Sequence, residues 1–141
     1  MKNKVIINWK EGLHFEANTP GGTIMLDGDP AFGGQGKGVR PKALMLDALA
    51  GCMGMDVASL MTKMRADKEV ENFSIQVEGE LTEEHPKYYK EVWIIVQFEG
   101  KELKKDKLEK AVRLSKERYC GVYAMFSHFA ELHLEVIFNE G

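Results

Sequence analysis

The chain has 141 residues, of which 44% are hydrophobic and 29% charged, a composition typical of a soluble globular protein. Its net charge of −3 offers no basic surface, so neither nucleic acid nor a membrane surface is expected as a partner. The apolar run at residues 5–7 is too short for a signal peptide or a transmembrane helix. We therefore expect a single domain over residues 1–141 and a cytoplasmic location.

The first residues predict an antiparallel meander of three strands. Apolar side chains alternate over 5–9 and 13–17, and a shorter strand follows at 23–26. Glu11-Gly12 and Gly21-Gly22 lie between these runs and suit tight turns.

A glycine-rich loop, DGDPAFGGQGKG, occupies residues 27–38. No Ser or Thr follows Lys37, so the loop lacks the phosphate-binding pattern. Its composition is typical of a flexible connector, and a mobile loop that closes over a pocket is the functional alternative.

A long helix is predicted from Pro41, which suits a first helical position, to about Met64. Residues 43–55 are apolar nearly all round, which is typical of a buried helix. Asp47 and Asp56 argue against a membrane span.

A long β-hairpin should follow, with strands at 75–81 and 92–98 and a turn at 82–86. Trp93 and Ile95 make the second face of the return strand apolar, which indicates cover on both faces and favours a partner subunit.

Asp106 and Glu109 resemble a capping pair that starts a second helix. One stripe of this helix is expected to contain the following residues: Leu108, Ala111, Val112, Ser115 and Tyr119. Cys120-Gly121 breaks the helix, a short helix follows within 122–129, and a last strand covers 132–138. The fold class predicted from these elements is α+β.

The two cysteines are either small buried hydrophobic residues or one redox couple. Cys52 lies in the most apolar part of the long helix, where burial raises the pKa of a thiol and the carboxylate of Asp56 opposes a thiolate. It needs a cation from elsewhere, for which Arg40, Lys42 and Lys10 are the candidates. Cys120, at a helix N-terminus, is expected to have a lowered pKa.

The segments RPKALMLDALAGCMGMDVASLMTKM and LSKERYCGVYAMFSHFAELHLEV resemble the OsmC/Ohr family. Cys52 lies eleven residues beyond Pro41, and the second cysteine has the setting Tyr119-Cys120-Gly121-Val122, both as in that family. The resemblance implies the OsmC-like fold: N-terminal antiparallel strands, a long buried central helix, a long hairpin, a second helical segment and a final strand.

The resemblance also implies an intertwined homodimer and a thiol-dependent peroxidase active in oxidative or osmotic stress. Cys52 would reduce an organic or inorganic hydroperoxide and become a sulfenic acid, Cys120 would form a disulfide with it, and an external dithiol would restore both thiols. No cofactor and no metal are expected, because the four histidines share no metal-ligand spacing.

Two departures from the family pattern leave alternatives open. Lys42 stands where the family has a glutamate, and no arginine precedes Arg40. Either Arg40 or Lys42 assists Cys52, or the site is less efficient, or its substrate differs. A weakly active redox-sensing or ligand-binding dimer is the alternative function, and a thiol hydrolase using His128 is a third.

Overall fold

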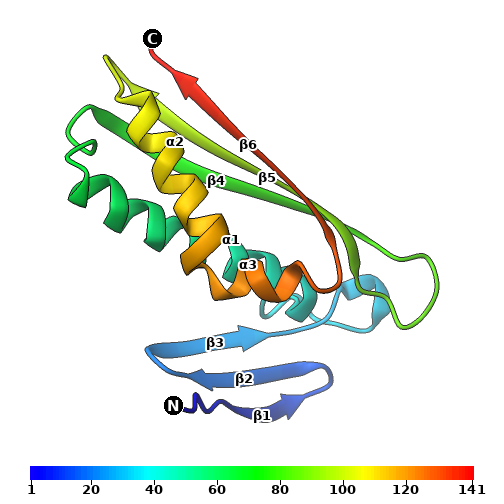
Figure 1. Cartoon of the computed structure of the whole chain (residues 1–141). Helices are drawn as coiled ribbons and strands as arrows, with labels where there is room; N and C mark the ends of the chain where they lie inside the picture. Colours follow the sequence, from blue (N-terminus) through cyan, green and yellow to red (C-terminus); the bar gives the residue numbers. More distant parts are fainter. The chain divides into compact units, whose positions relative to one another are not determined.

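The computed structural model describes residues 1–141 and contains two three-stranded sheets (Figure 1). The chain divides into two compact units, Met1–Met45 and Leu46–Gly141, and each is described by itself. Both units combine strands with helical segments, so the α+β class predicted from the sequence is confirmed.

The first unit is built on the predicted meander. Its antiparallel sheet has the order β1-β2-β3. The three strands are β1 (Ile6–Glu11), β2 (His14–Thr19) and β3 (Gly22–Leu26). Gly12 has a φ of 52° in the turn between β1 and β2, a left-handed conformation that glycine adopts without a steric penalty.

The glycine-rich loop of the first unit is organised around Asp27, whose side chain is only 2% exposed. Its carboxylate accepts hydrogen bonds from the backbone N–H groups of Gly28, Gln35 and Lys37 at 2.7, 3.2 and 3.1 Å. Burial by itself opposes ionisation, but these hydrogen bonds outweigh it and lower the pKa of Asp27. These hydrogen bonds join both ends of the glycine-rich loop to Asp27, and the loop includes the short 3-10 helix η1 (Pro30–Phe32).

The second unit contains the sheet β4-β5-β6. Strands β4 (Val70–Leu81) and β5 (Tyr89–Gly100) form the predicted antiparallel hairpin, and β6 (Glu131–Asn139) pairs with β5 in parallel. A parallel neighbour requires a crossover connection, and the helices between β5 and β6 supply it. In Figure 1 the helices α1, α2 and α3 all lie on one side of this sheet.

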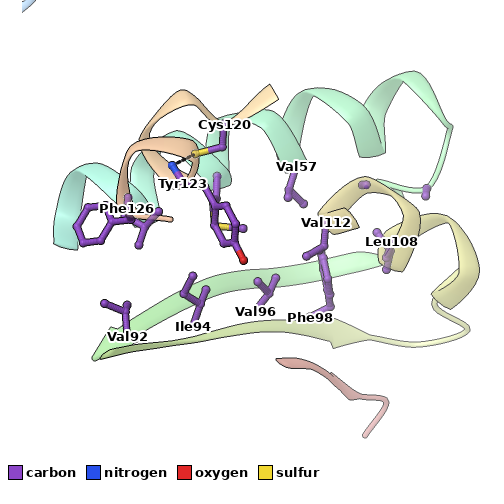
Figure 2. Packing of buried hydrophobic residues seen from close by; sticks show 14 of the residues in the cluster. Val57, Val92, Ile94, Val96, Phe98, Leu108, Val112, Cys120, Tyr123 and Phe126 are labelled. Atoms are coloured by element: carbon purple, nitrogen blue, oxygen red, sulfur yellow. Dashed lines mark hydrogen bonds between the residues drawn. The ribbon is translucent and has the colours of Figure 1, made fainter. Parts of the chain in front are cut away.

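Alternate residues of β5 form the centre of the core (Figure 2). Val92, Ile94, Val96 and Phe98 are fully or almost fully buried. The ring of Phe98 is stacked between neighbouring strands, with centroid distances of 5.0 Å to Phe73 and 5.7 Å to Phe138. The intervening residues, Trp93 among them, are only partly buried in the single chain.

Helix α1 (Pro41–Lys63) is long and continuous, but its burial differs from the expectation. Only Leu49, Met53 and Val57 are buried, at the spacing of one helical face. The other faces find no complete cover within one chain. By length and composition α1 is also able to cross a membrane, but the core helix of a soluble protein meets the same criteria.

The crossover contains α2 (Lys105–Leu114), the π-helical turn η2 (Ser115–Tyr119) and α3 (Gly121–Phe126). Two details predicted from the sequence are wrong. Lys104 precedes α2 and makes no side-chain capping bond, so Asp106 lies in the first turn rather than at the cap. Tyr119 is 54% exposed because the wider turn of η2 rotates it out of the buried stripe that ends at Ser115.

Candidate functional site

The second unit brings its two cysteines together. Cys52 projects from the middle of α1, whereas Cys120 lies between η2 and α3. Their sulfur atoms and a carboxylate oxygen of Asp56 all lie within 4.8 Å of one another, and both thiols are free. Residues far apart in the sequence thus form one cluster of two sulfurs and one carboxylate.

Cys120 is held by the start of α3 (Figure 2). Its backbone is extended, with φ −80° and ψ 100°, and its Sγ accepts a 3.2 Å hydrogen bond from the backbone N–H of Tyr123. The N–H of Cys120 itself donates to the carbonyl of Ser115 at 2.8 Å, which closes the π-helical turn. The backbone around the break in the helix therefore determines where this sulfur lies.

The pKa of Cys120 is raised to about 12, contrary to the sequence prediction. Burial is the main cause, since the residue is only 3% exposed, and the neighbouring Cys52 thiol raises the pKa further. The hydrogen bond from Tyr123 acts in the opposite direction but does not compensate. The helix N-terminus was located correctly, but its effect on the thiol is smaller than that of the apolar environment.

Asp56 lies one helical turn beyond Cys52 on α1 and is oriented by Ser115. The Ser115 hydroxyl, which is fully buried, donates a 2.9 Å hydrogen bond to Oδ2 of Asp56. Ser115 was expected only as part of an apolar stripe. A hydroxyl within an apolar stripe indicates that a polar partner lies nearby in the fold, because a buried polar group needs a hydrogen-bond partner.

A cavity of about 420 Å³ opens beside this cluster. Its lining residues come from α1 and η2: Asp56, Ser59, Leu60, Lys63 and Tyr119. Asp56 is thus shared between the cavity and the two sulfurs. Lys63 also lines the cavity, and this cation is not among the candidates that the sequence offered for assisting Cys52.

The other candidate residues, Arg40 and Lys42, belong to the first unit. The Arg40 guanidinium lies 3.4 Å from the carboxylate of Asp29, and Lys42 is exposed in the first turn of α1. Their assistance to Cys52 stays a prediction.

The glycines that flank Cys52 do not reflect close packing within the second unit. A Cβ atom at Gly51 would have no neighbour within 4 Å, and one at Gly54 would make an ordinary contact with Ile75. Gly51 therefore leaves open space next to Cys52, as access of a substrate to this residue would require.

A second group of potential ligands lies on the sheet. His133 Nε2 is 2.6 Å from Glu91 Oε2 and 3.7 Å from Glu131 Oε1, and the His133 ring stacks on Trp93. The sequence could not indicate this group, because the parallel register of β5 and β6 brings it together.

Comparison with known proteins identifies the family. The family model "OsmC-like protein" matches residues 34–135. The chain therefore belongs to the OsmC-like protein family, and the resemblance found in the sequence is confirmed.

Individual relatives agree with this assignment. Protein YhfA of Escherichia coli K12 is 32% identical over 120 residues, which is 84% of this chain and 85% of YhfA. The crystal structure of a hypothetical protein from Aquifex aeolicus VF5 has a TM-score of 0.85 and 29% identity, and covers 99% of this chain and 97% of its own. The Organic Hydroperoxide Resistance Protein OhrB of Bacillus subtilis shares the fold, with a TM-score of 0.62, 17% identity and coverage of 96% and 98%.

Proposed function

We propose that this chain is a thiol-dependent peroxidase that reduces organic or inorganic hydroperoxides through Cys52 and Cys120, in oxidative or osmotic stress defence. The observation that carries the proposal is the meeting of the two sulfurs within 4.8 Å. A resolving cysteine must reach the sulfenic acid of its partner, and here only a small movement separates the two atoms.

The reaction proceeds in three balanced steps. The Cys52 thiolate attacks the terminal oxygen of ROOH, the O–O bond breaks, and the products are Cys52 sulfenic acid and an alkoxide that takes up a proton to become ROH. The Cys120 thiolate then attacks the sulfur of Cys52, and hydroxide leaves as water after protonation. An external dithiol finally reduces the Cys52–Cys120 disulfide and becomes a disulfide itself.

The division of roles follows from the two environments. Cys120 is almost completely buried and its pKa is raised to about 12, so it is poorly suited to attack a peroxide first. Cys52 is partly exposed, and its neighbour Gly51 has open space where a side chain would stand. Cys52 is therefore the peroxidatic residue and Cys120 the resolving one.

The substrate class is proposed from the relatives and from the surroundings of the site. Structural neighbours are named organic hydroperoxide resistance proteins, from Legionella pneumophila and Bacillus subtilis. Met53 and Phe126, both buried, contribute apolar surface to the core cluster to which Cys52 is adjacent. An apolar environment of this kind favours an alkyl hydroperoxide.

The active form is proposed to be a homodimer. Three large apolar or aromatic side chains near the cysteines in sequence are uncovered in the single chain: Met55 is 77%, Met125 62% and Tyr119 54% exposed. Apolar surface gains free energy when it is removed from water, so cover over these side chains would stabilise an assembly. A partner subunit would bury this surface and close the site, and its cations, or Arg40 and Lys42, would assist Cys52.

The proposal is tested by mixing reduced protein with cumene hydroperoxide and counting free thiols. Two thiols should disappear per peroxide consumed, and peptide mapping should find Cys52 joined to Cys120 within one chain. In Cys120→Ser the reaction should stop at a Cys52 sulfenic acid that dimedone traps, whereas Cys52→Ser should consume no peroxide. Thiols that remain free after prolonged exposure to peroxide would contradict the proposal.

A weakly active redox sensor is the second candidate, and Asp56 favours it. Its carboxylate oxygen lies within 4.8 Å of both sulfurs, and this fixed negative charge would oppose the negative charge that develops in the peroxide reaction and slow it. If the chain is a sensor, each molecule should be oxidised once, without repeated turnover under excess dithiol. Sustained peroxide consumption with a dithiol such as dihydrolipoate would exclude the sensor and support the peroxidase.

A further inference from the structure

The cluster formed by Cys52, Asp56 and Cys120 has the composition of a metal site as well as that of a redox couple. Two sulfurs and a carboxylate oxygen lie within 4.8 Å of one another and are three potential ligands for a single ion. The sequence predicts no metal site, because its four histidines share no ligand spacing and its two cysteines lie far apart. The fold produces the ligand set.

We infer that the reduced cluster binds a thiophilic divalent cation, Zn²⁺ being the natural representative. Thiolate sulfur suits zinc, and a carboxylate oxygen is an accepted third ligand. On binding, each of the two thiols loses one proton while the carboxylate coordinates as it is, so the three ligands carry three negative charges against the two positive charges of the ion. A water molecule would complete a tetrahedral sphere.

The distance between the two sulfurs is closer to that in a zinc site than to that in a disulfide. Two sulfurs bound to one tetrahedral zinc lie roughly 3.8 Å apart, given Zn–S bonds of about 2.3 Å. The two sulfurs here lie within 4.8 Å of each other, so they need to approach by about 1 Å at most to reach the separation found at zinc. A disulfide requires the sulfurs to approach to about 2.05 Å, a larger movement.

The neighbours of the cluster orient its ligands as metal sites require. The Ser115 hydroxyl holds the carboxylate of Asp56 at 2.9 Å, and the N–H of Tyr123 points at Sγ of Cys120 at 3.2 Å. Hydrogen bonds of this kind determine the orientation of metal ligands and tune their affinity. The cavity of about 420 Å³ reaches one of the three ligands, Asp56.

Metal binding and peroxide reduction would exclude each other at this site. A bound ion occupies both sulfurs and protects them from peroxide, and disulfide formation removes both thiolates and releases the ion. This regulatory part of the inference rests on the proposed function, whereas the binding of the ion rests on the cluster alone.

The binding is tested by titrating the reduced, metal-free full chain with Co²⁺, which gives a thiolate-to-cobalt charge-transfer absorption, and by displacing the cobalt with Zn²⁺. The absorption should saturate at one ion per chain and be absent from protein whose disulfide has been formed. It should also be lost in Cys52→Ser, in Cys120→Ser and in wild-type protein alkylated with N-ethylmaleimide. Asp56→Asn should weaken binding about 10-fold or more.

His133→Ala is the matched control, because it removes the imidazole of the second group of potential ligands, Glu91, Glu131 and His133, and leaves the cysteines intact. It should retain the charge-transfer absorption and its affinity. Absence of the absorption in wild-type protein with two titratable thiols would overturn the inference, as would unchanged affinity in the Asp56→Asn variant.

Peroxide consumption is measured separately, in metal-free buffer and after loading with Zn²⁺. Zinc should slow the loss of thiols at least 10-fold, and a chelator should restore the rate. If metal-free protein consumes no peroxide but binds cobalt through its thiolates, the peroxidase proposal fails and the metal site stands. If it consumes peroxide but gives no cobalt–thiolate absorption, the metal site fails alone.

Discussion

The Ser115 hydroxyl donates a 2.9 Å hydrogen bond to the carboxylate of Asp56, and this contact joins the π-helical turn after α2 to the helix that contains Cys52. Ser115 is also the residue whose carbonyl accepts the N–H of Cys120. One buried serine thus connects the acidic member of the cluster with the second cysteine. Substitution of its side chain removes the hydrogen bond to Asp56 but leaves the backbone carbonyl that accepts from Cys120.

We expect Ser115→Ala to lower the free energy of unfolding by about 1–2 kcal/mol, because Asp56 loses the donor that satisfies its partly buried carboxylate. Urea denaturation followed by circular dichroism measures this change. Ser59→Ala is the control, since Ser59 is exposed on the same helix and should change stability by less than about 0.5 kcal/mol. Equal effects of the two substitutions would contradict the structural role of Ser115.

The raised pKa of Cys120, about 12, predicts a loss of stability at alkaline pH. The folded state favours the neutral thiol, so the stabilisation is complete below the unfolded-state pKa of about 8.5 and is lost as pH rises through the folded-state value. Urea unfolding between pH 8 and pH 11 should show this decline. Cys120→Ser should show a shallower one, and identical slopes would argue against the burial of a neutral thiol.

The same environments predict an order of alkylation. Iodoacetamide at pH 8 should modify Cys52 before Cys120, because Cys52 is partly exposed while Cys120 is buried and its pKa is raised. Mass spectrometry of tryptic peptides at successive times measures both rates. In urea-unfolded protein the two rates should become similar, and faster labelling of Cys120 in the folded protein would reverse the roles assigned to the two residues.

Phe98 should be among the most sensitive positions of the core. It is fully buried and stacked between Phe73 and Phe138, so Phe98→Ala leaves a cavity and should lower the free energy of unfolding by about 3–5 kcal/mol. Thermal and urea unfolding measure the loss. Phe32→Ala, at a site that is 83% exposed, is the control and should be nearly neutral.

Met55→Glu should weaken the proposed homodimer at least 10-fold, because it places a charge in the apolar surface that a partner would bury. Light scattering coupled to size-exclusion chromatography at several protein concentrations gives the mass. Lys110→Glu, which puts a carboxylate on an exposed position of α2, should leave the mass unchanged. A wild-type chain that is monomeric at all concentrations would exclude the dimer.

Much of the fold followed from local patterns. Alternating apolar residues predicted the meander and the hairpin, and the side chains of β5 that were expected to face inward, Val92 to Phe98, form the core. The burial of α1 was harder to predict, because composition says that a helix is apolar but not how much of it one chain can cover. Only three of its residues are buried within the chain.

The sequence alone determined the family, the α+β class and the choice of Cys52 and Cys120 as candidate site residues. Residue type, periodicity and motif spacing are properties of the sequence and can be read without coordinates. Only the tertiary structure decided that Cys120 and Ser115 lie beside Cys52 and Asp56, that burial raises the pKa of Cys120, and that His133 meets Glu91. These relationships depend on which helix faces meet and on the register of β5 and β6. Packing of the whole chain sets both, because residues distant in sequence supply the contacts.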